Sequence, residues 1–383
     1  TGCHAKPFLR LWLSSLTEEA IREAFSNLRP GSDYDTLYAA AKCRSESDWI
    51  VGLNATRNFT VRYGAGGILW SVGRVQTPVL AMISRRDDEI RLFKPEPFWE
   101  LLTRYRKVIF KFRGDRSKKK ANAQALLNRV SGYPFVIQSI ETKKQKVQPP
   151  QLYDLTELQR DMNRRYGMSA DDTLKAAQSL YENKAITYPR TDSRCLSTDM
   201  KGEIPGILHK LEAVSPAEIG PLNLDALPFT TRIINDKKVS DHHAIIPTGK
   251  LPGRLPSQSK RVFDAVVMRL IAVFYSHSLK EVTTVDGVSN EAPFRARGVR
   301  ALSPGWTVLY PKNPTGEAPQ NEEDSDEPDE QELPPFTGGA TGPHDPFIKA
   351  GQTQPPKHFT ENSLLGAMET AGKLVEEDHL KEA

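Results

Sequence analysis

Apolar residues in the first 90 positions recur with the spacing of amphipathic helices. A first helix is predicted after Thr17, a residue type that caps helices, and it ends at Pro30-Gly31. A second helical pattern begins near Asp33 and extends to Gly52. A third begins at Thr77-Pro78, where a capping threonine precedes a proline suited to the first helical position. The beginning of the chain is therefore predicted to be helical.

From Phe93 to about Val147 the pattern changes to short β-prone runs separated by basic loops. These runs are Phe98-Trp99, Val108-Ile109-Phe110 and Phe135-Val136-Ile137. Pro149-Pro150 closes the segment and predicts a domain boundary.

Helical periodicity returns over residues 151–275. Ser169 and Asp172 have the spacing of a capping box at a helix start. Residues 185–188 predict a short strand that ends at Pro189. Two helices followed by a strand are typical of a winged-helix-like module.

The rest of the chain continues this alternation. A buried helix is predicted over 261–275, β structure over 280–312, and a last helix after its cap at Thr360. The expected fold class is thus mixed α and β, in several domains.

Composition excludes several classes of protein. No apolar run reaches the roughly 18 residues of a membrane span, so no membrane partner is expected. Three distant cysteines (Cys3, Cys43, Cys195) exclude a disulfide scaffold and a zinc cluster, and they fit a cytoplasmic setting. The first residue is Thr1 rather than Met, which predicts a chain cut from a longer one.

The net charge of +4 conceals an uneven distribution. Residues 301–345 contain ten acids and one base, whereas the other 338 residues hold 51 bases and 38 acids, a net charge of +13. The acidic run 322–332 contains a proline and predicts a solvated loop. A basic body of this kind indicates a polyanionic partner.

The first candidate for chemistry is the segment 187–193. Pro189 keeps it extended, so Tyr188 and Arg190 are predicted to point the same way. A phenolic oxygen can attack phosphorus, and a guanidinium can pair with the phosphate. A tyrosine at a strand end in a polar turn explains the same residues without chemistry.

The second candidate is the histidine pair in the segment 240–248. His242 or His243 could donate to a phosphate oxygen or move a proton near neutral pH. The pair lacks further ligands in register, so it is poor evidence for a metal. A structural histidine at a strand start is the alternative.

Two further candidates lie in the first 80 residues. The segment 71–78 precedes a predicted helix, where backbone N–H groups favour a phosphate and Arg74 and Gln76 could contact DNA; the alternative is a simple turn. Arg44 and Asp48 have the spacing of an ion pair, and Trp49 follows. Interleaved bases and aromatics bind single strands, although a buried Trp49 with flanking salt bridges fits equally well.

Some chemistry is not indicated. Metal-assisted phosphoryl transfer needs clustered carboxylates, and the only dense acidic cluster is the loop 322–332, so no metal ligand is assigned. No Walker-type phosphate loop is present, which argues against ATP hydrolysis.

Taken in order, these motifs resemble the type IA DNA topoisomerases, in particular the topoisomerase III branch. The resemblance covers essentially the whole chain. It is carried by Arg10-Leu11-Trp12-Leu13-Ser14-Ser15-Leu16, Asp48-Trp49-Ile50-Val51-Gly52, Asn54-Ala55-Thr56-Arg57, Gly73-Arg74-Val75-Gln76-Thr77-Pro78, Tyr188-Pro189-Arg190-Thr191-Asp192-Ser193 and His242-His243-Ala244-Ile245-Ile246-Pro247.

The family fold implied by this resemblance is a torus with a gate, built from helical domains, a β arch and a winged-helix-like active-site domain. The implied parts are 1–90, the first helical DNA-binding part; 91–150, the first part of the arch; 151–275, the helical active-site domain; 276–345, the return through the arch with the acidic loop; and 346–383, the second, truncated helical part.

The resemblance also assigns roles to residues. The implied catalytic residues are the nucleophile Tyr188, the phosphate-binding Arg190 and the active-site His242. The implied DNA-binding residues are Ser71, Val72, Gly73, Arg74, Val75, Gln76, Arg44, Trp49, Arg57, Arg62, Thr191 and Ser193.

The implied reaction is transient cleavage of one DNA strand through a 5′-phosphotyrosine, strand passage and religation, without ATP. The implied partners are single-stranded and underwound duplex DNA, at the bacterial nucleoid or a plasmid. The family binds Mg²⁺ in an N-terminal TOPRIM domain, and this chain is expected to begin after that domain and to end before the family's closing segment. A separately supplied TOPRIM part is therefore an expected partner. The alternative is a gate module that binds single strands without cleaving them.

Overall fold

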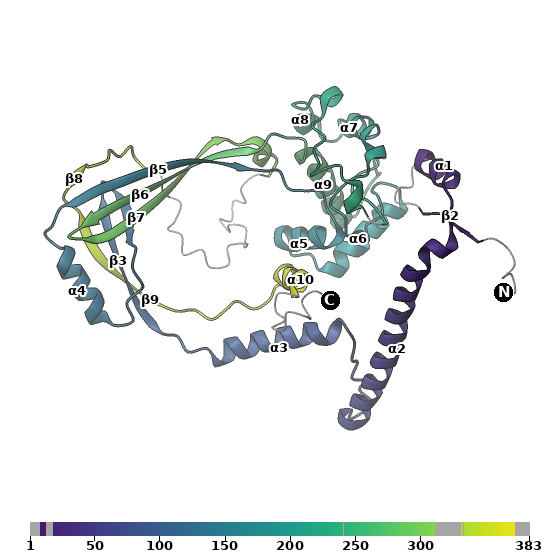
Figure 1. Cartoon of the computed structure of the whole chain (residues 1–383), viewed down its shortest axis with the longest axis horizontal. Helices are drawn as coiled ribbons and strands as arrows, with labels where there is room; N and C mark the ends of the chain where they lie inside the picture. Colours follow the sequence, from purple (N-terminus) through teal and green to yellow (C-terminus); the bar gives the residue numbers. More distant parts are fainter. Residues whose placement is uncertain (1–7, 13–17, 240, 311–330, 332, 372–383) are drawn as a thin grey trace. The chain divides into compact units, whose positions relative to one another are not determined.

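The computed structural model describes residues 8–12, 18–239, 241–310, 331 and 333–371 (Figure 1). The predicted cap Thr17, Ser240 and the acidic run 322–332 apart from Gln331 lie outside these residues. The chain forms two compact units, and it passes between them more than once. The first unit comprises Thr1–Arg91, Gln151–Leu270 and Lys357–Ala383, and the second comprises Leu92–Pro150 and Ile271–Pro356.

The second unit is built on a seven-stranded antiparallel sheet with the order β8-β5-β6-β7-β4-β3-β9. Its strands are β3 (Pro97–Tyr105), β4 (Val108–Phe112), β5 (Phe135–Val147), β6 (Ser278–Ser289), β7 (Ala292–Ser303), β8 (Thr341–Gly342) and β9 (Asp345–Gln352). One helix, α4 (Lys120–Val130), and one 3-10 turn, η5 (Gly305–Leu309), accompany them. The β-prone runs of the sequence lie in β3, β4 and β5, so those strand predictions are confirmed.

Aromatic side chains form the core of this sheet. Phe135 packs with its ring centroid 4.9 Å from that of Phe110 and 5.0 Å from that of Tyr105. The hairpin between β6 and β7 turns at Asn290 and Glu291, which both have positive φ, as a two-residue turn of this hand requires. The long β5–β6–β7 ladder that results gives this unit its extended sheet (Figure 1).

The first unit is helical. Its helices are α1 (Glu18–Ser26), α2 (Asp35–Tyr63), α3 (Gln76–Leu92), α5 (Leu155–Tyr166), α6 (Ala170–Glu182), α7 (Ile204–Leu211), α8 (Pro216–Ile219), α9 (Ser257–Ala272) and α10 (Glu361–Glu369). Short pieces complete it: β1 (Leu9–Arg10) paired with β2 (Arg29–Pro30), and the 3-10 turns η1 (Gly31–Tyr34), η2 (Thr198–Lys201), η3 (Leu224–Ala226) and η4 (Asp236–Lys238).

Side-chain caps mark the helix starts that the sequence predicts. The Ser169 hydroxyl accepts the Asp172 N–H at the start of α6, and Thr360 opens α10 with a capping box. Asp154 caps α5 by accepting the Glu157 N–H at 2.7 Å. At the other end of α5, Gly167 adopts the left-handed conformation of a helix C-cap.

The second predicted helix is confirmed, and it extends beyond Gly52, the last position of its pattern, to Tyr63. Two sequence-based expectations need correction. Thr77 lies within the first turn of α3 and does not cap it, since the helix begins at Gln76. Residues 185–188 form no regular strand; only Ile186 makes an isolated bridge, to Pro247. Prolines at 189 and 247 lack the N–H groups that would extend a ladder there.

Candidate active site

Tyr188 follows α6 in an irregular layer of three extended segments. One bridge joins Tyr153 to Ile245, and a second joins Ile186 to Pro247. The N–H of Thr187 donates to the carbonyl of Ile246 at 2.9 Å. The segment 242–247 therefore lies between the start of α5 and the tyrosine segment.

The ring of Tyr188 contacts two other rings. Its centroid lies 4.5 Å from that of His242 and 5.2 Å from that of Tyr181 at the end of α6. The side chain is partly buried, and among the described residues its hydroxyl has no hydrogen-bond partner. The ring is thus oriented by its neighbours while the phenolic oxygen stays available for chemistry.

The two adjacent histidines have different surroundings. His243 is buried, and its Nδ1 lies 2.8 Å from the carbonyl oxygen of Ala244, to which it must donate. Burial lowers the pKa of His243, so its ring is held neutral. His242 is partly exposed and contacts Tyr188. The alternative of a structural histidine therefore describes His243, and His242 remains the candidate for chemistry.

Arg190 is exposed, and the part of the chain that the structure describes provides it with no hydrogen bond or ion pair. Pro189, between it and Tyr188, is buried. An exposed guanidinium two residues from the tyrosine is free to pair with a phosphate. Its phosphate-binding role stays a prediction.

Thr191 and Ser193 are buried, and their hydroxyls have partners within the protein. Thr191 Oγ1 donates to the carbonyl of His242 at 2.8 Å and accepts the N–H of Ser193 at 3.1 Å. Ser193 Oγ donates to the carbonyl of Cys195 at 3.1 Å. DNA contact by these two residues stays a prediction, while the hydrogen bonds indicate an internal role.

The segment 71–76 connects α2 and α3 and is fastened to α2. The hydroxyl of Thr56 accepts the N–H of Val72 at 3.0 Å and lies 3.3 Å from its carbonyl oxygen. The guanidinium of Arg74 donates to Asp48 at 2.7 Å. Asp48 thus pairs with Arg74, and the ion pair predicted between Arg44 and Asp48 does not form among the described residues.

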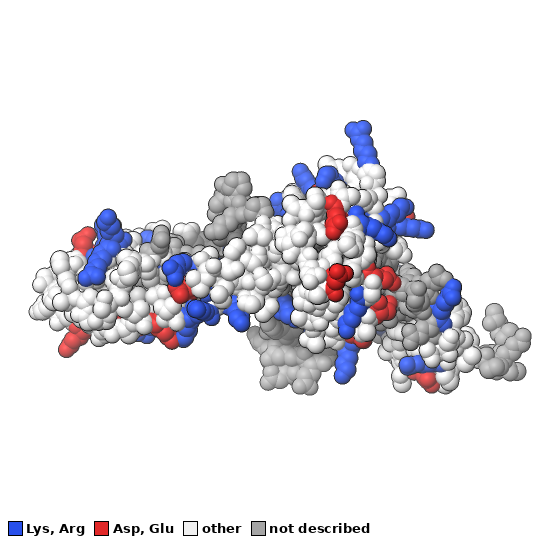
Figure 2. All heavy atoms as spheres, turned by 90° about the horizontal axis from the view of Figure 1, so that it is seen from above, with Lys and Arg blue, Asp and Glu red and all other residues white. Residues whose placement is uncertain are grey.

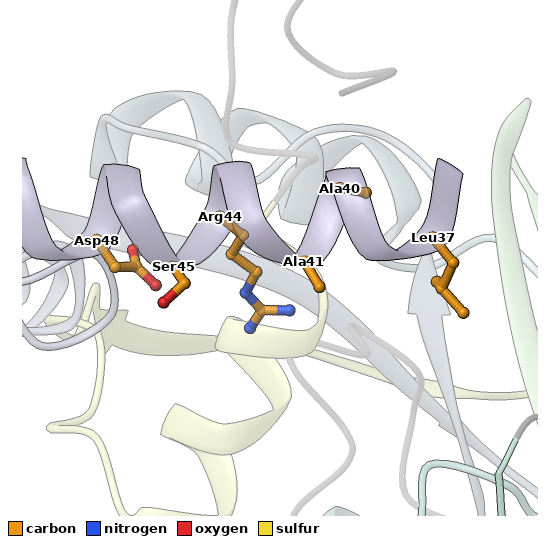
Figure 3. A pocket seen from close by; sticks show the side chains of 6 residues that line it. All are labelled: Leu37, Ala40, Ala41, Arg44, Ser45 and Asp48. Carbon is orange, nitrogen blue, oxygen red and sulfur yellow. The ribbon is translucent and has the colours of Figure 1, made fainter. Parts of the chain in front are cut away.

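The predicted DNA-binding residues of α2 do not share one face. At about 100° per residue, Arg44 and Arg62 lie on one side of the helix and Trp49 and Arg57 on the other. Figure 3 shows Arg44 beside Ala41 and Ser45, in a shallow hollow lined entirely by α2. Trp49 is 67% exposed, so the alternative of a buried tryptophan is wrong.

The described residues contain no group of three or more His, Cys, Asp or Glu side chains that could hold a metal ion. A Mg²⁺ site built from such a group is therefore not found among these residues. Figure 2 shows Lys and Arg side chains on the surface of both units, with acidic side chains among them. No helix among the described residues is long and apolar enough to cross a membrane.

Comparison with known proteins places these motifs in a family. The model of the DNA topoisomerase family matches residues 32–372. DNA topoisomerase 3 from Bacillus anthracis is 38% identical over 385 residues, which cover 97% of this chain and 51% of that protein. DNA topoisomerase 3 from Shouchella clausii is also 38% identical, over 384 residues with the same shares. The chain thus spans about half the length of the curated relatives it matches.

A solved structure supports the fold. Full-length topoisomerase I from Thermotoga maritima matches with a TM-score of 0.67 and 22% identity, over 95% of this chain and 58% of that one. The mixed α and β fold with several domains agrees with this likeness. The resemblance found in the sequence is confirmed, and the chain belongs to the type IA DNA topoisomerase family, together with the DNA topoisomerase 3 proteins.

Proposed function

We propose that this chain carries the nucleophile of a type IA DNA topoisomerase that cleaves one DNA strand through Tyr188. The observation that carries the proposal is the oriented ring of Tyr188, 4.5 Å from that of His242, with a hydroxyl that has no partner among the described residues. The membership of the family supports the same assignment. The Mg²⁺ ion of the reaction, and the acidic side chains that hold it, are proposed to come from a TOPRIM-containing polypeptide.

The proposed reaction conserves the energy of the broken bond. Tyr188 Oη attacks the phosphorus of a phosphodiester, the bond from phosphorus to the 3′ oxygen breaks, and the phenolic proton ends on the leaving 3′ hydroxyl. Arg190 is placed to pair with the phosphate charge, and His242 is placed to donate to a phosphate oxygen. Attack by the 3′ hydroxyl reverses each change, so no ATP is required.

The proposed partner of the chain is a TOPRIM-containing polypeptide that supplies Mg²⁺. None of the 29 residues of α2 is buried, and its exposed large apolar residues include Leu37, Trp49 and Phe59. Exposed apolar side chains of this size commonly mark surfaces that meet a partner. We therefore expect part of α2 to contact the rest of the complete enzyme, which would act on single-stranded and underwound DNA in the cytoplasm, at the nucleoid or on plasmids.

The test uses a 3′-labelled single-stranded oligonucleotide, Mg²⁺ and a TOPRIM-containing polypeptide, since the fragment that stays on the tyrosine keeps its 3′ end. A covalent adduct is expected with the unmodified chain and none with Tyr188→Phe, because phenylalanine keeps the ring contacts and removes the attacking oxygen. Binding of the oligonucleotide should persist in Tyr188→Phe. The matched control is Tyr166→Phe, which removes an exposed tyrosine hydroxyl at the end of α5.

Two results would contradict the proposal. An adduct formed by Tyr188→Phe would place the nucleophile elsewhere. Binding without any adduct, even with the TOPRIM polypeptide present, would favour a gate module that binds single strands without cleaving them.

A further inference from the structure

We propose that Thr187 and Thr191 are positioning residues that set the distance between the rings of Tyr188 and His242. This inference rests on the proposed function, because it gives these residues a role in cleavage. Both residues bond to the segment 242–246, and they do so from opposite sides of Tyr188. Neither acts on DNA directly in this proposal.

The segments around Tyr188 are joined by isolated bridges, and the hydroxyl of Thr187 adds two hydrogen bonds between them. It accepts the N–H of Ile246 at 3.0 Å and donates to the carbonyl of Ala244 at 3.2 Å. A hydroxyl is required for this, since it is both donor and acceptor. The β-branched side chain of threonine also restricts χ1, which holds the oxygen in place.

Thr191 provides the second attachment. Its buried hydroxyl donates to the carbonyl of His242 itself at 2.8 Å and accepts the N–H of Ser193 at 3.1 Å. Tyr188 lies in the short stretch between the two threonines. Because each end of that stretch is bonded to the segment that carries His242, these bonds fix the two backbone segments against each other, and with them the positions from which the two rings extend.

Other bonds keep the histidine segment folded when a threonine hydroxyl is removed. The N–H of Ala244 donates to the carbonyl of Cys195 at 2.9 Å, and that of Ile245 donates to the carbonyl of Tyr153 at 2.8 Å. Removal of one hydroxyl should therefore change the relative position of the Tyr188 and His242 rings without unfolding the layer. The positioning role can then be measured separately from an effect on stability.

The experiment compares Thr187→Val and Thr191→Val with Thr187→Ser and Thr191→Ser. The control is Thr173→Val, which removes a buried hydroxyl that donates to the carbonyl of Ser169 at 2.9 Å within α6. The first readout needs no catalysis: proton NMR of the chain reports ring-current shifts of His242 and its nuclear Overhauser contact with Tyr188. The second is the single-turnover rate of adduct formation, measured with Mg²⁺ and the TOPRIM polypeptide, beside oligonucleotide affinity.

The valine variants should lose the ring contact and form adduct about tenfold to a hundredfold more slowly, since small misplacements of reacting groups have effects of this size. The oligonucleotide affinity of Thr187→Val should not change. The serine variants should restore both readouts, and Thr173→Val should leave both unaltered.

An unchanged ring contact in both valine variants would overturn the positioning role. So would an adduct rate equal to that of the unmodified chain. A third outcome separates the two proposals. If the valine variants lose the ring contact while neither they nor the unmodified chain form any adduct, the positioning of the rings is supported and the proposed cleavage function fails.

Discussion

Asp161 shows at the residue scale how a buried charge can hold a candidate site in place. Its carboxylate is enclosed in the first unit, where it accepts from the hydroxyl of Tyr153 and pairs with Arg164, Arg165 and Arg269. The guanidinium of Arg269 lies 3.8 Å from the ring centroid of Tyr153. Since the backbone of Tyr153 pairs with Ile245, this cluster supports the histidine segment.

Burial alone would raise the pKa of Asp161, but the charge of Arg269, the hydrogen bond from Tyr153 and the charges of Arg164 and Arg165 outweigh it and lower the pKa below 3.8. A carboxylate whose pKa is lowered by folding stabilises the protein above its unfolded pKa. That contribution is lost as the pH falls through the folded pKa.

We predict that Asp161→Asn destabilises the first unit by about 3–5 kcal/mol at pH 7, because it leaves Arg269 buried without its carboxylate. The difference from the unmodified chain should be constant from neutral pH down to mild acid and begin to shrink as the pH falls below 3.8, where the carboxylate of the unfolded chain becomes protonated; it should go on shrinking until the folded carboxylate, whose pKa is lower, is protonated too. Native-state hydrogen exchange in α5 and α9 measures it. The control is Asp171→Asn, which removes an exposed partner of Lys175 and should change the free energy of unfolding little. A difference between Asp161→Asn and the unmodified chain that grows in acid would contradict the argument.

At the residue scale the sequence pointed to Tyr188 and Arg190 and, through the family resemblance, to His242, but its local pattern could not say which of His242 and His243 is buried. Alternation in an extended segment makes adjacent side chains point in opposite directions, and only the fold decides which one is inside. Thr187 was missed because nothing in its local pattern distinguishes it from any threonine before a tyrosine. Its partners, Ala244 and Ile246, lie far along the chain.

At the scale of elements, α2 and the segment 71–76 behave as one structure. Thr56 fastens Val72, Asp48 fastens Arg74, and Thr60 accepts the N–H of Trp70 at 3.1 Å. The helical period predicted α2 as far as Gly52, but it did not predict the remaining turns to Tyr63. Gly52 is retained inside the helix, and an added Cβ there would lie 3.6 Å from the carbonyl oxygen of Val72.

We predict that Thr56→Val speeds hydrogen exchange of the Val72 amide about fivefold, as expected for the loss of a hydrogen bond worth about 1 kcal/mol. Oligonucleotide affinity should fall, since the loop would lose its fixed conformation. Thr56→Ser is the matched variant and should restore both properties. Exchange that is unchanged in Thr56→Val would show that Arg74 and Asp48 hold the loop without Thr56.

At the scale of the whole molecule, the charge distribution bears on DNA binding. The net charge of +4 conceals a chain that carries +13 outside residues 301–345. On the face that Figure 2 shows, Lys and Arg side chains are spread along the molecule rather than collected in one patch. Binding through dispersed bases releases counterions from the DNA and depends strongly on salt.

We predict that the affinity for single-stranded oligonucleotides falls linearly on a log–log plot against salt concentration, with a slope of about −0.7 for each phosphate neutralised. Arg44→Ala and Arg62→Ala should each reduce the steepness by roughly one such contact. Lys175→Ala, whose cation is already paired with Asp171, is the control. An affinity independent of salt would exclude phosphate contacts as the basis of binding.

The sequence by itself determined the family, the capped starts of α6 and α10, and the runs that form β3, β4 and β5, and it pointed to Tyr188 as the nucleophile, which stays a prediction. These depend on short-range chemistry: caps, periodicity and residues at fixed spacing, which are readable along the chain. Only the tertiary structure decided that Asp48 pairs with Arg74, that His243 is the inner histidine, and that Thr187 and Thr191 hold the segment of His242. Each of these depends on hydrogen bonds or ion pairs between distant segments, and folding alone brings such groups together.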